Sequence, residues 1–86
     1  MASYSIEWKA SAVKELRKIP GHLLVGILAQ VEFLRDSPRP DGVKKLKGSE
    51  HTYRIRVGEY RIIYAIYDKK LLVEIVRVRN RKDAYS

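Results

Sequence analysis

The sequence predicts a single α+β domain in which a helical hairpin packs on one face of a small, mainly antiparallel four-stranded sheet. Three observations support this class. The chain has 86 residues, which is enough for one hydrophobic core, so residues 1–86 are expected to form one domain. Two segments with helical periodicity lie between residues 9 and 34. The second half alternates apolar and charged residues as strands do, and the resulting element order is β-α-α-β-β-β.

The N-terminal half begins with a short strand over residues 3–8, followed by two helices. The first helix ends at Pro20-Gly21, and the second ends before Pro38, because residues that precede proline avoid the helical region. So short a link makes the two helices an antiparallel hairpin. Their apolar stripes are expected to cover the sheet rather than a membrane, since the polar faces carry both signs of charge. The stripes are Ala12, Val13, Leu16 and Ile19, then Leu24, Ile27, Leu28, Val31 and Leu34.

A loop over residues 37–42 leads to three strands, predicted at residues 52–57, 60–67 and 71–79. Gly58-Glu59 has the composition of a two-residue hairpin turn. With that turn, Arg56 lies opposite Arg61, and both share with Arg54 the face that points away from the helices. The side of Arg77 and Arg79 depends on whether the next turn has two or three residues, which the pattern leaves open.

The charge of the chain is concentrated in its second half. The net charge is +8, of which residues 44–86 carry +7, so the expected partner is a polyanion, either nucleic acid or an anionic membrane. Like charges directly across a strand pair cost about 0.2–1 kcal/mol. Neither Glu50 nor Glu59 is placed to neutralise the three strand arginines. We therefore expect them to hold an anion, and the planar guanidinium fork matches phosphate oxygens.

Several other chemistries are excluded or lack support. The chain has no Cys, which excludes disulfides, thiolate catalysis and Cys-based metal sites. No N-terminal apolar run has the length of a signal peptide or membrane span, so a soluble cytoplasmic protein is expected. His22 and His51 stand in separate segments, the carboxylates are scattered, and no glycine-rich phosphate loop follows a strand. We expect no cofactor and no metal site.

The sequence resembles the RelE branch of the RelE/ParE toxin superfamily. The similarity covers nearly the whole chain, including the N-terminal strand and the helical hairpin. The most specific part is the paired pattern of a Tyr-basic-Ile-basic strand and a Gly-x-Tyr-Arg-x-x-Tyr strand, closed by an Arg-x-x-x-Tyr end. In this sequence the pattern comprises Leu46-Lys47-Gly48, Tyr53-Arg54-Ile55-Arg56, Gly58-Glu59-Tyr60-Arg61, Tyr64 and Arg81-Lys82-Asp83-Ala84-Tyr85.

The resemblance implies the toxin of a type II toxin–antitoxin system, an endoribonuclease that enters the ribosomal A site and cuts mRNA there. The reaction would be metal-free attack of the ribose 2′-hydroxyl on the adjacent phosphate. Its products would be a 2′,3′-cyclic phosphate and a 5′-hydroxyl end, and translation and growth would stop. The implied partners are mRNA, ribosomal RNA and a cognate antitoxin that neutralises the toxin and represses its own operon by binding DNA.

Roles for individual residues follow from the same resemblance. Arg54 and Arg56 would lie at the scissile bond, Arg61 would bind the phosphate, Arg81 would stabilise or protonate the departing 5′-oxygen, and Tyr85 would stack on the substrate nucleotide. Well-studied members carry Lys where Arg54 and Arg56 stand; arginine keeps the charge but is already protonated and is a poor general base. Six further basic residues would bind RNA or the ribosome: Lys44, Lys45, Lys47, Arg77, Arg79 and Lys82.

Two other functions remain open at this point. One is a ParE-like toxin of the same fold that poisons DNA gyrase and cuts no RNA. The other is a nucleic-acid-binding module without chemistry, which a basic cluster alone would allow. The catalytic set of four arginines and Tyr85 argues against the gyrase-directed function, because gyrase-directed relatives generally lack this set.

Overall fold

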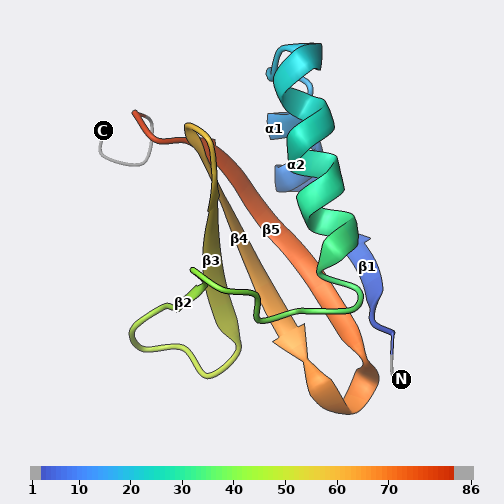
Figure 1. Cartoon of the computed structure of the whole chain (residues 1–86). Helices are drawn as coiled ribbons and strands as arrows, with labels where there is room; N and C mark the ends of the chain where they lie inside the picture. The colour runs from blue at the N-terminus through green and yellow to red at the C-terminus, as the bar shows by residue number, and fades with distance from the viewer. Residues whose placement is uncertain (1–2, 83–86) are drawn as a thin grey trace.

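A computed structural model describes residues 3–82 of the chain. It has two helices and five strands, with the helices on one side of a twisted sheet (Figure 1). The elements are β1 (Ser5–Trp8), α1 (Ala10–Leu16), α2 (Gly21–Phe33), β2 (Lys44–Lys45), β3 (Thr52–Val57), β4 (Tyr60–Tyr67), the 3-10 turn η1 (Asp68–Lys70) and β5 (Leu72–Asn80). Neither helix in this part of the chain has the length and hydrophobicity that crossing a membrane requires.

The predicted α+β class is confirmed, but the prediction of four strands is wrong. The sheet has five strands in the order β1-β5-β4-β3-β2, with β1 parallel to β5 and the other neighbours antiparallel. The additional strand, β2, has only two residues, and both are exposed lysines. It exists because Lys44 and Lys45 pair with Arg54 and Tyr53 of β3. A two-residue strand is too short to show alternation, so its sequence carries no signal.

The β3–β4 hairpin has the predicted register. Val57 lies opposite Tyr60, Arg56 opposite Arg61, and Tyr53 opposite Tyr64. Gly58 begins the turn with a φ of 58°, a left-handed conformation that glycine adopts without the steric cost of a Cβ. The hairpin therefore presents its apolar side chains to the helices and its arginines to the opposite face.

The β4–β5 pair contains a bulge that settles the orientation of the last strand. Tyr67 pairs with Leu72 and Tyr64 with Ile75, but the next pair joins Ile63 to Arg77, so Val76 has no residue opposite it. The inserted residue shifts the alternation of β5. As a result Ile75 and Val78 are both buried, while Arg77 and Arg79 lie on the same face as Arg61.

The hydrophobic core lies between the helices and the inner face of the sheet. Its α2 residues recur at helical spacing, and its strand residues occupy alternate positions, so both periodicities predicted from the sequence meet in one layer. The buried cluster comprises Ala12, Ile19, Ile27, Val31, Leu34, Tyr53, Ile55, Ile62, Tyr64, Ile66, Val73, Ile75 and Val78.

Helix α1 covers the outer edge of β5 where β1 ends. The last pair of β1 and β5 joins Trp8 to Ile75, so the backbone beyond it would otherwise lack partners on that side. Ser11 Oγ donates to the carbonyl of Val76 at 2.8 Å, and Glu15 Oε1 accepts from the N–H of Val78 at 3.0 Å. Side chains of α1 thus replace the missing strand.

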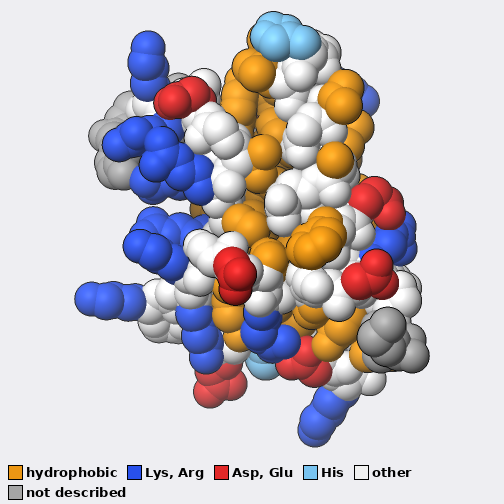
Figure 2. All heavy atoms as spheres, viewed as in Figure 1, with side chains coloured by type: hydrophobic (Ala, Val, Ile, Leu, Met, Phe, Trp, Pro, Cys, Tyr) orange, Lys and Arg blue, Asp and Glu red, His pale blue; other side chains and the backbone are white. Residues whose placement is uncertain are grey.

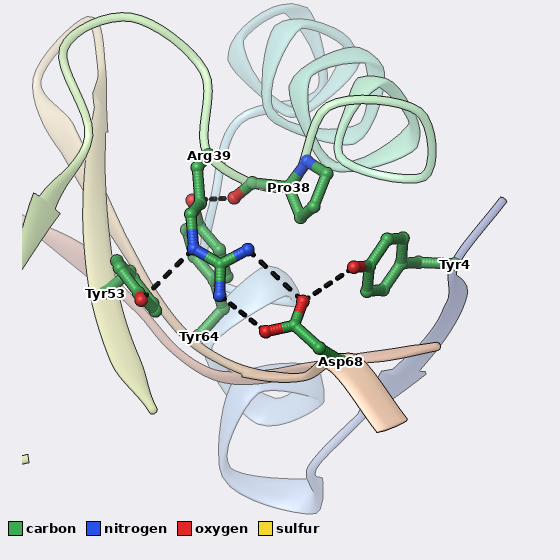
Figure 3. Close-up of polar contacts among 6 residues, drawn as sticks. All are labelled: Tyr4, Pro38, Arg39, Tyr53, Tyr64 and Asp68. Carbon is green, nitrogen blue, oxygen red and sulfur yellow. Dashed lines mark hydrogen bonds and ion pairs between the residues drawn. The ribbon is translucent and has the colours of Figure 1, made fainter. Parts of the chain in front are cut away.

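The loop over residues 37–42 is held by a polar cluster around Arg39 (Figure 3). Arg39 forms a bidentate ion pair with Asp68, with nitrogen–oxygen distances of 2.8 and 3.2 Å, and its Nε donates to the Tyr53 hydroxyl at 3.2 Å. Tyr4 donates to the same carboxylate at 2.6 Å. Tyr64 donates to the carbonyl of Pro38 at 2.8 Å, and burial raises the pKa of Tyr64, which keeps this hydroxyl protonated. The loop is thereby joined to β3, β4 and the N-terminus.

The Asp68 carboxylate makes the stability of this cluster depend on pH. The hydrogen bonds from Arg39 and then from Tyr4 lower the pKa of Asp68 from 3.8 to about 2. Because the folded-state value is depressed, its stabilisation is fully present above pH 3.8 and is lost as pH falls towards 2. We expect Asp68→Asn to lower the melting temperature at neutral pH and to flatten its decline in this acid range. Thermal melts of wild type, Asp68→Asn and the control Asp41→Asn test this; equal acid dependence in all three would contradict it.

Candidate nucleic-acid interface and catalytic site

The β3–β4 hairpin positions three arginines on the sheet face opposite the helices. Arg54 and Arg56 alternate along β3 with Tyr53 and Ile55, which are buried in the core, so the arginines must point to the other side. Arg61 lies directly opposite Arg56 on β4. Arg54 and Arg61 are half-buried, and Arg56 is exposed. The structure thus brings together the three residues that the hairpin pattern assigns to one face.

A small cavity of about 200 Å³ opens between these arginines. Its walls are Lys44, Arg54, Arg56 and Arg61, with Gly42 and Ile55 completing the surface. Lys44 reaches this place because β2 sets it directly opposite Arg54. Four cationic side chains from three strands therefore surround a space that is large enough for a phosphate group. We call these four residues the basic cluster.

The two β3 arginines of the basic cluster lack a carboxylate partner in the part of the chain that the structure describes. Among residues 3–82, no carboxylate forms an ion pair with Arg54 or Arg56. Arg56 donates from Nε to the carbonyl of Gly58 at 3.2 Å, which fixes its side chain over the hairpin turn. Figure 2 shows Lys and Arg side chains along the side of the molecule where β2 and β3 lie. Such a field attracts polyanions and strengthens at low ionic strength.

Arg77 and Arg79 belong to the same face but have a carboxylate partner. Arg79 Nε lies 3.4 Å from Glu15 Oε2, and a terminal nitrogen of Arg77 lies 4.0 Å from the same atom. The sequence reasoning considered only acidic residues close to the hairpin in the chain. It missed Glu15, which reaches this face from α1 across the edge of β5.

The backbone of Arg81 is anchored at the end of the sheet that carries the β3–β4 turn. Its N–H donates to the carbonyl of Glu59 at 2.7 Å, which brings the end of β5 beside the turn next to Arg56. Lys82 follows, with its N–H donating to Asn80 Oδ1 at 3.0 Å. Tyr85 lies outside the described residues.

The remaining predicted RNA-binding residues lie farther out. Lys45 is exposed on β2 opposite Tyr53, and Lys47 is exposed in the loop that joins β2 to β3. Neither contributes to the 200 Å³ cavity. His22 and His51 also lie outside its walls, and His51 instead contacts the ring of Tyr67 at a centroid distance of 5.4 Å.

An apolar surface on α2 is a second feature, and it includes Leu28, which the predicted stripe placed in the core. Leu23, Val25, Leu28 and Phe33 are exposed, although the predicted stripe residues Ile27 and Val31 are buried. A cavity of about 630 Å³ separates the end of α2 from β3 and the loop over residues 37–42. Gly42, Ile55 and Arg56 line both this cavity and the basic one, so the two spaces adjoin. In Figure 2 hydrophobic side chains run along this helix. A helix that is apolar on most of its surface is typical of one with a partner.

Comparison with known proteins places this geometry in a family. The family model described as the ParE toxin of the type II toxin–antitoxin system parDE matches residues 6–85. Toxin RelE3 of Methanocaldococcus jannaschii is 35% identical over 78 residues, covering 86% of each chain. The mRNA interferase toxin RelE of Escherichia coli is 28% identical, covering 98% of this chain and 92% of that one.

The fold agrees with the same relatives. The RelE chain in the crystal structure of the archaeal RelE–RelB complex from Pyrococcus horikoshii superposes with a TM-score of 0.82 at 28% identity, covering 92% of this chain and 96% of that one. The sequence of the present chain over residues 6–85 and its pair of helices on a five-stranded sheet therefore agree with the same group of toxins. The chain belongs to the RelE/ParE superfamily as a RelE-type toxin.

Proposed function

We propose that this chain is the toxin of a type II toxin–antitoxin pair and that it cleaves mRNA in the A site of the ribosome. The observation that carries the proposal is the basic cluster, in which Lys44, Arg54, Arg56 and Arg61 surround one small cavity on an open sheet face. The name mRNA interferase, which the relative from Escherichia coli bears, supports RNA as the substrate.

The proposed reaction is transesterification within the RNA backbone. The ribose 2′-oxygen loses its proton to water and attacks the adjacent phosphorus, the bond from phosphorus to the 5′-oxygen breaks, and that oxygen takes up a proton. A 2′,3′-cyclic phosphate and a 5′-hydroxyl end result. Negative charge accumulates on the phosphate oxygens as the fifth bond forms. Fixed guanidinium groups stabilise that charge without reorganising, and a single donor of this kind typically contributes about 10²–10³ in rate.

The arginines act on charge and position rather than as bases. A guanidinium is protonated at any ordinary pH, so Arg54 and Arg56 cannot accept the proton of the 2′-hydroxyl. Their role is to hold the phosphate and turn its backbone towards in-line attack. Arg81 stabilises or protonates the departing 5′-oxygen, and Tyr85 stacks on the substrate nucleotide. The proposal is a metal-free reaction.

The outer basic residues would guide the toxin to RNA. Lys45, Lys47 and Lys82 are exposed outside the basic cluster, and Arg77 and Arg79 extend the field along β5. Contacts of lysine and arginine to phosphates supply affinity that depends on salt and not on sequence. We assign to these three lysines the binding of ribosomal RNA and of mRNA outside the cut, whereas Arg77 and Arg79, which have Glu15 as a partner, contribute to the positive field.

A cognate antitoxin is the second proposed partner. RelE of Pyrococcus horikoshii was crystallised as a complex with RelB. This chain has two features that suit such a protein: a net charge of +8, which favours an acidic partner, and the exposed apolar surface of α2. The antitoxin would neutralise the toxin and, as a DNA-binding repressor, limit its synthesis.

Primer extension on cellular mRNA after brief induction of the toxin tests the proposed function. We expect cuts within codons of translated messages, with 5′-hydroxyl ends downstream of each cut and 2′,3′-cyclic phosphates upstream. The same messages with their start codons removed serve as the control, and should stay intact because ribosomes no longer carry the toxin to them. Cleavage that is equal in translated and untranslated RNA would contradict the role of the ribosome.

A gyrase-directed toxin is the alternative, and the ParE name of the matching family model favours it. It predicts intact mRNA together with DNA-damage signalling after induction. The same culture distinguishes the two functions, because RNA and a damage-responsive reporter can be measured side by side.

A further inference from the structure

Glu15 connects the helical layer to the basic face. Its Oε1 accepts the backbone N–H of Val78 at 3.0 Å, which fixes the carboxylate against β5. Its Oε2 faces two arginines, with Arg79 Nε at 3.4 Å and Arg77 at 4.0 Å. The side chain is 20% exposed, so water screens these contacts less than it would those of a fully exposed pair. One anchored carboxylate is thus shared between two guanidinium groups.

The basic face therefore divides into two parts with different electrostatics. Arg77 and Arg79 already lie within 4.0 Å of an anionic partner, and this carboxylate competes with a phosphate for both guanidinium groups. Arg54 and Arg56, by contrast, form no ion pair with a carboxylate of residues 3–82 and open onto the cavity of about 200 Å³. All four arginines share one sheet face by register, but Arg79 lines, together with Glu15, a separate cavity of about 380 Å³ at the edge of β5.

We propose that Glu15 is a positioning residue that withholds Arg77 and Arg79 from RNA and so concentrates phosphate binding on the basic cluster. This inference rests on the proposed function, because it takes RNA as the ligand. Glu15 occupies the position that a phosphate would otherwise take between the two arginines. By limiting the number of phosphates bound, it weakens attachment to RNA at sites where the basic cluster is not engaged.

The salt dependence of RNA binding measures how many phosphates a protein contacts. For single strands, the slope of log affinity against log salt concentration is about −0.7 for each phosphate neutralised. The probe is a short single-stranded 2′-O-methyl RNA, which keeps its phosphates but lacks the attacking hydroxyl and is not consumed. Binding is followed by fluorescence anisotropy between about 50 and 200 mM salt, the range over which this effect is large.

Glu15→Gln is the informative variant, because glutamine keeps the oxygen that accepts the N–H of Val78 and removes only the charge. We expect tighter binding at low salt and a slope steeper by about 1.4, which corresponds to two additional phosphates. The control is Glu32→Gln, since Glu32 pairs with Arg35 on the helical side and with no other basic residue among residues 3–82. It removes the same charge and should leave the slope unchanged. A purely structural role for Glu15 would not steepen the slope.

The double substitution Arg77→Gln and Arg79→Gln supplies a second, independent measurement. In the wild-type background it should leave the slope almost unchanged, and in the Glu15→Gln background it should restore the wild-type slope. The inference is overturned if Glu15→Gln does not steepen the slope, or if the double substitution flattens the wild-type slope by about 1.4. If circular dichroism shows that Glu15→Gln does not fold, the effect of the double substitution on the slope in the wild-type background decides the inference.

The two proposals fail in distinguishable ways. Wild-type protein that cleaves mRNA on ribosomes but shows no effect of Glu15 on the slope retains the proposed function and loses the inference. If the wild type and its variants bind the probe with the expected slopes but the wild type leaves mRNA intact, the inference is retained and the proposed function is lost. Absence of binding of the free RNA probe by the wild type would overturn the inference alone, because the proposed function is tested by cleavage on ribosomes.

Discussion

Arg61→Ala is expected to abolish growth arrest when the toxin is expressed and to slow mRNA cleavage on ribosomes by about 10²–10³-fold. Arg61 lies opposite Arg56 and lines the cavity in which the scissile phosphate would sit. Loss of its guanidinium removes stabilisation that is needed mainly in the transition state, so kcat should fall more than KM rises. Single-turnover cleavage on programmed ribosomes and growth after induction provide the two measurements.

One matched variant, Arg35→Ala, and the fold of Arg61→Ala itself separate this effect from a general loss of charge or fold. Arg35→Ala removes one positive charge from the helical side, where Arg35 pairs with Glu32 at 2.7 Å, and should remain fully toxic. Arg61→Ala should remain folded, because Arg61 is partly exposed and lies outside the core cluster. A third variant, Arg81→Ala with Tyr85→Ala, should also relieve growth arrest. Undiminished toxicity of both Arg61→Ala and this double variant would count decisively against the ribonuclease.

Ile62→Ala is expected to lower the free energy of unfolding by about 2–5 kcal/mol. Ile62 is 0% exposed and lies on β4 between Ile55 of β3 and Val78 of β5, so the truncation leaves a cavity in the middle of the sheet. Ile62→Val removes one methylene group and should cost about 0.5–1.5 kcal/mol. Urea titration followed by circular dichroism measures both, and the transition midpoint should shift with little change in its slope.

The neighbouring position offers a control for this prediction. Ile63 follows directly on β4 but points to the opposite face and is only half-buried. Ile63→Ala should therefore destabilise the protein clearly less than Ile62→Ala. Equal losses would mean that the alternation of β4 is not what the structure shows. Because Ile62 lies behind the basic cluster, Ile62→Ala should also reduce toxicity as temperature rises and the folded fraction falls.

The sequence alone predicts the elements whose signals are local. The helices, the proline-glycine link and the strands of the hairpin follow from periodicity and turn residues, and the pairing of Arg56 with Arg61 follows from counting outward from Gly58-Glu59. Those steps depend on neighbours within a few residues along the chain. They were enough to place Arg54, Arg56 and Arg61 on one face.

The other parts of the site depend on contacts between distant segments. Lys44 joins the basic cluster only because a two-residue strand pairs with β3, and the bulge at Val76 decides that Arg77 and Arg79 share the face of Arg61. Glu15 meets those two arginines across more than sixty positions of sequence, through an edge of β5 that β1 leaves uncovered. Local pattern therefore determined the positive hairpin, whereas tertiary packing decided which of its charges are neutralised, because charges interact through distance in space and not along the chain.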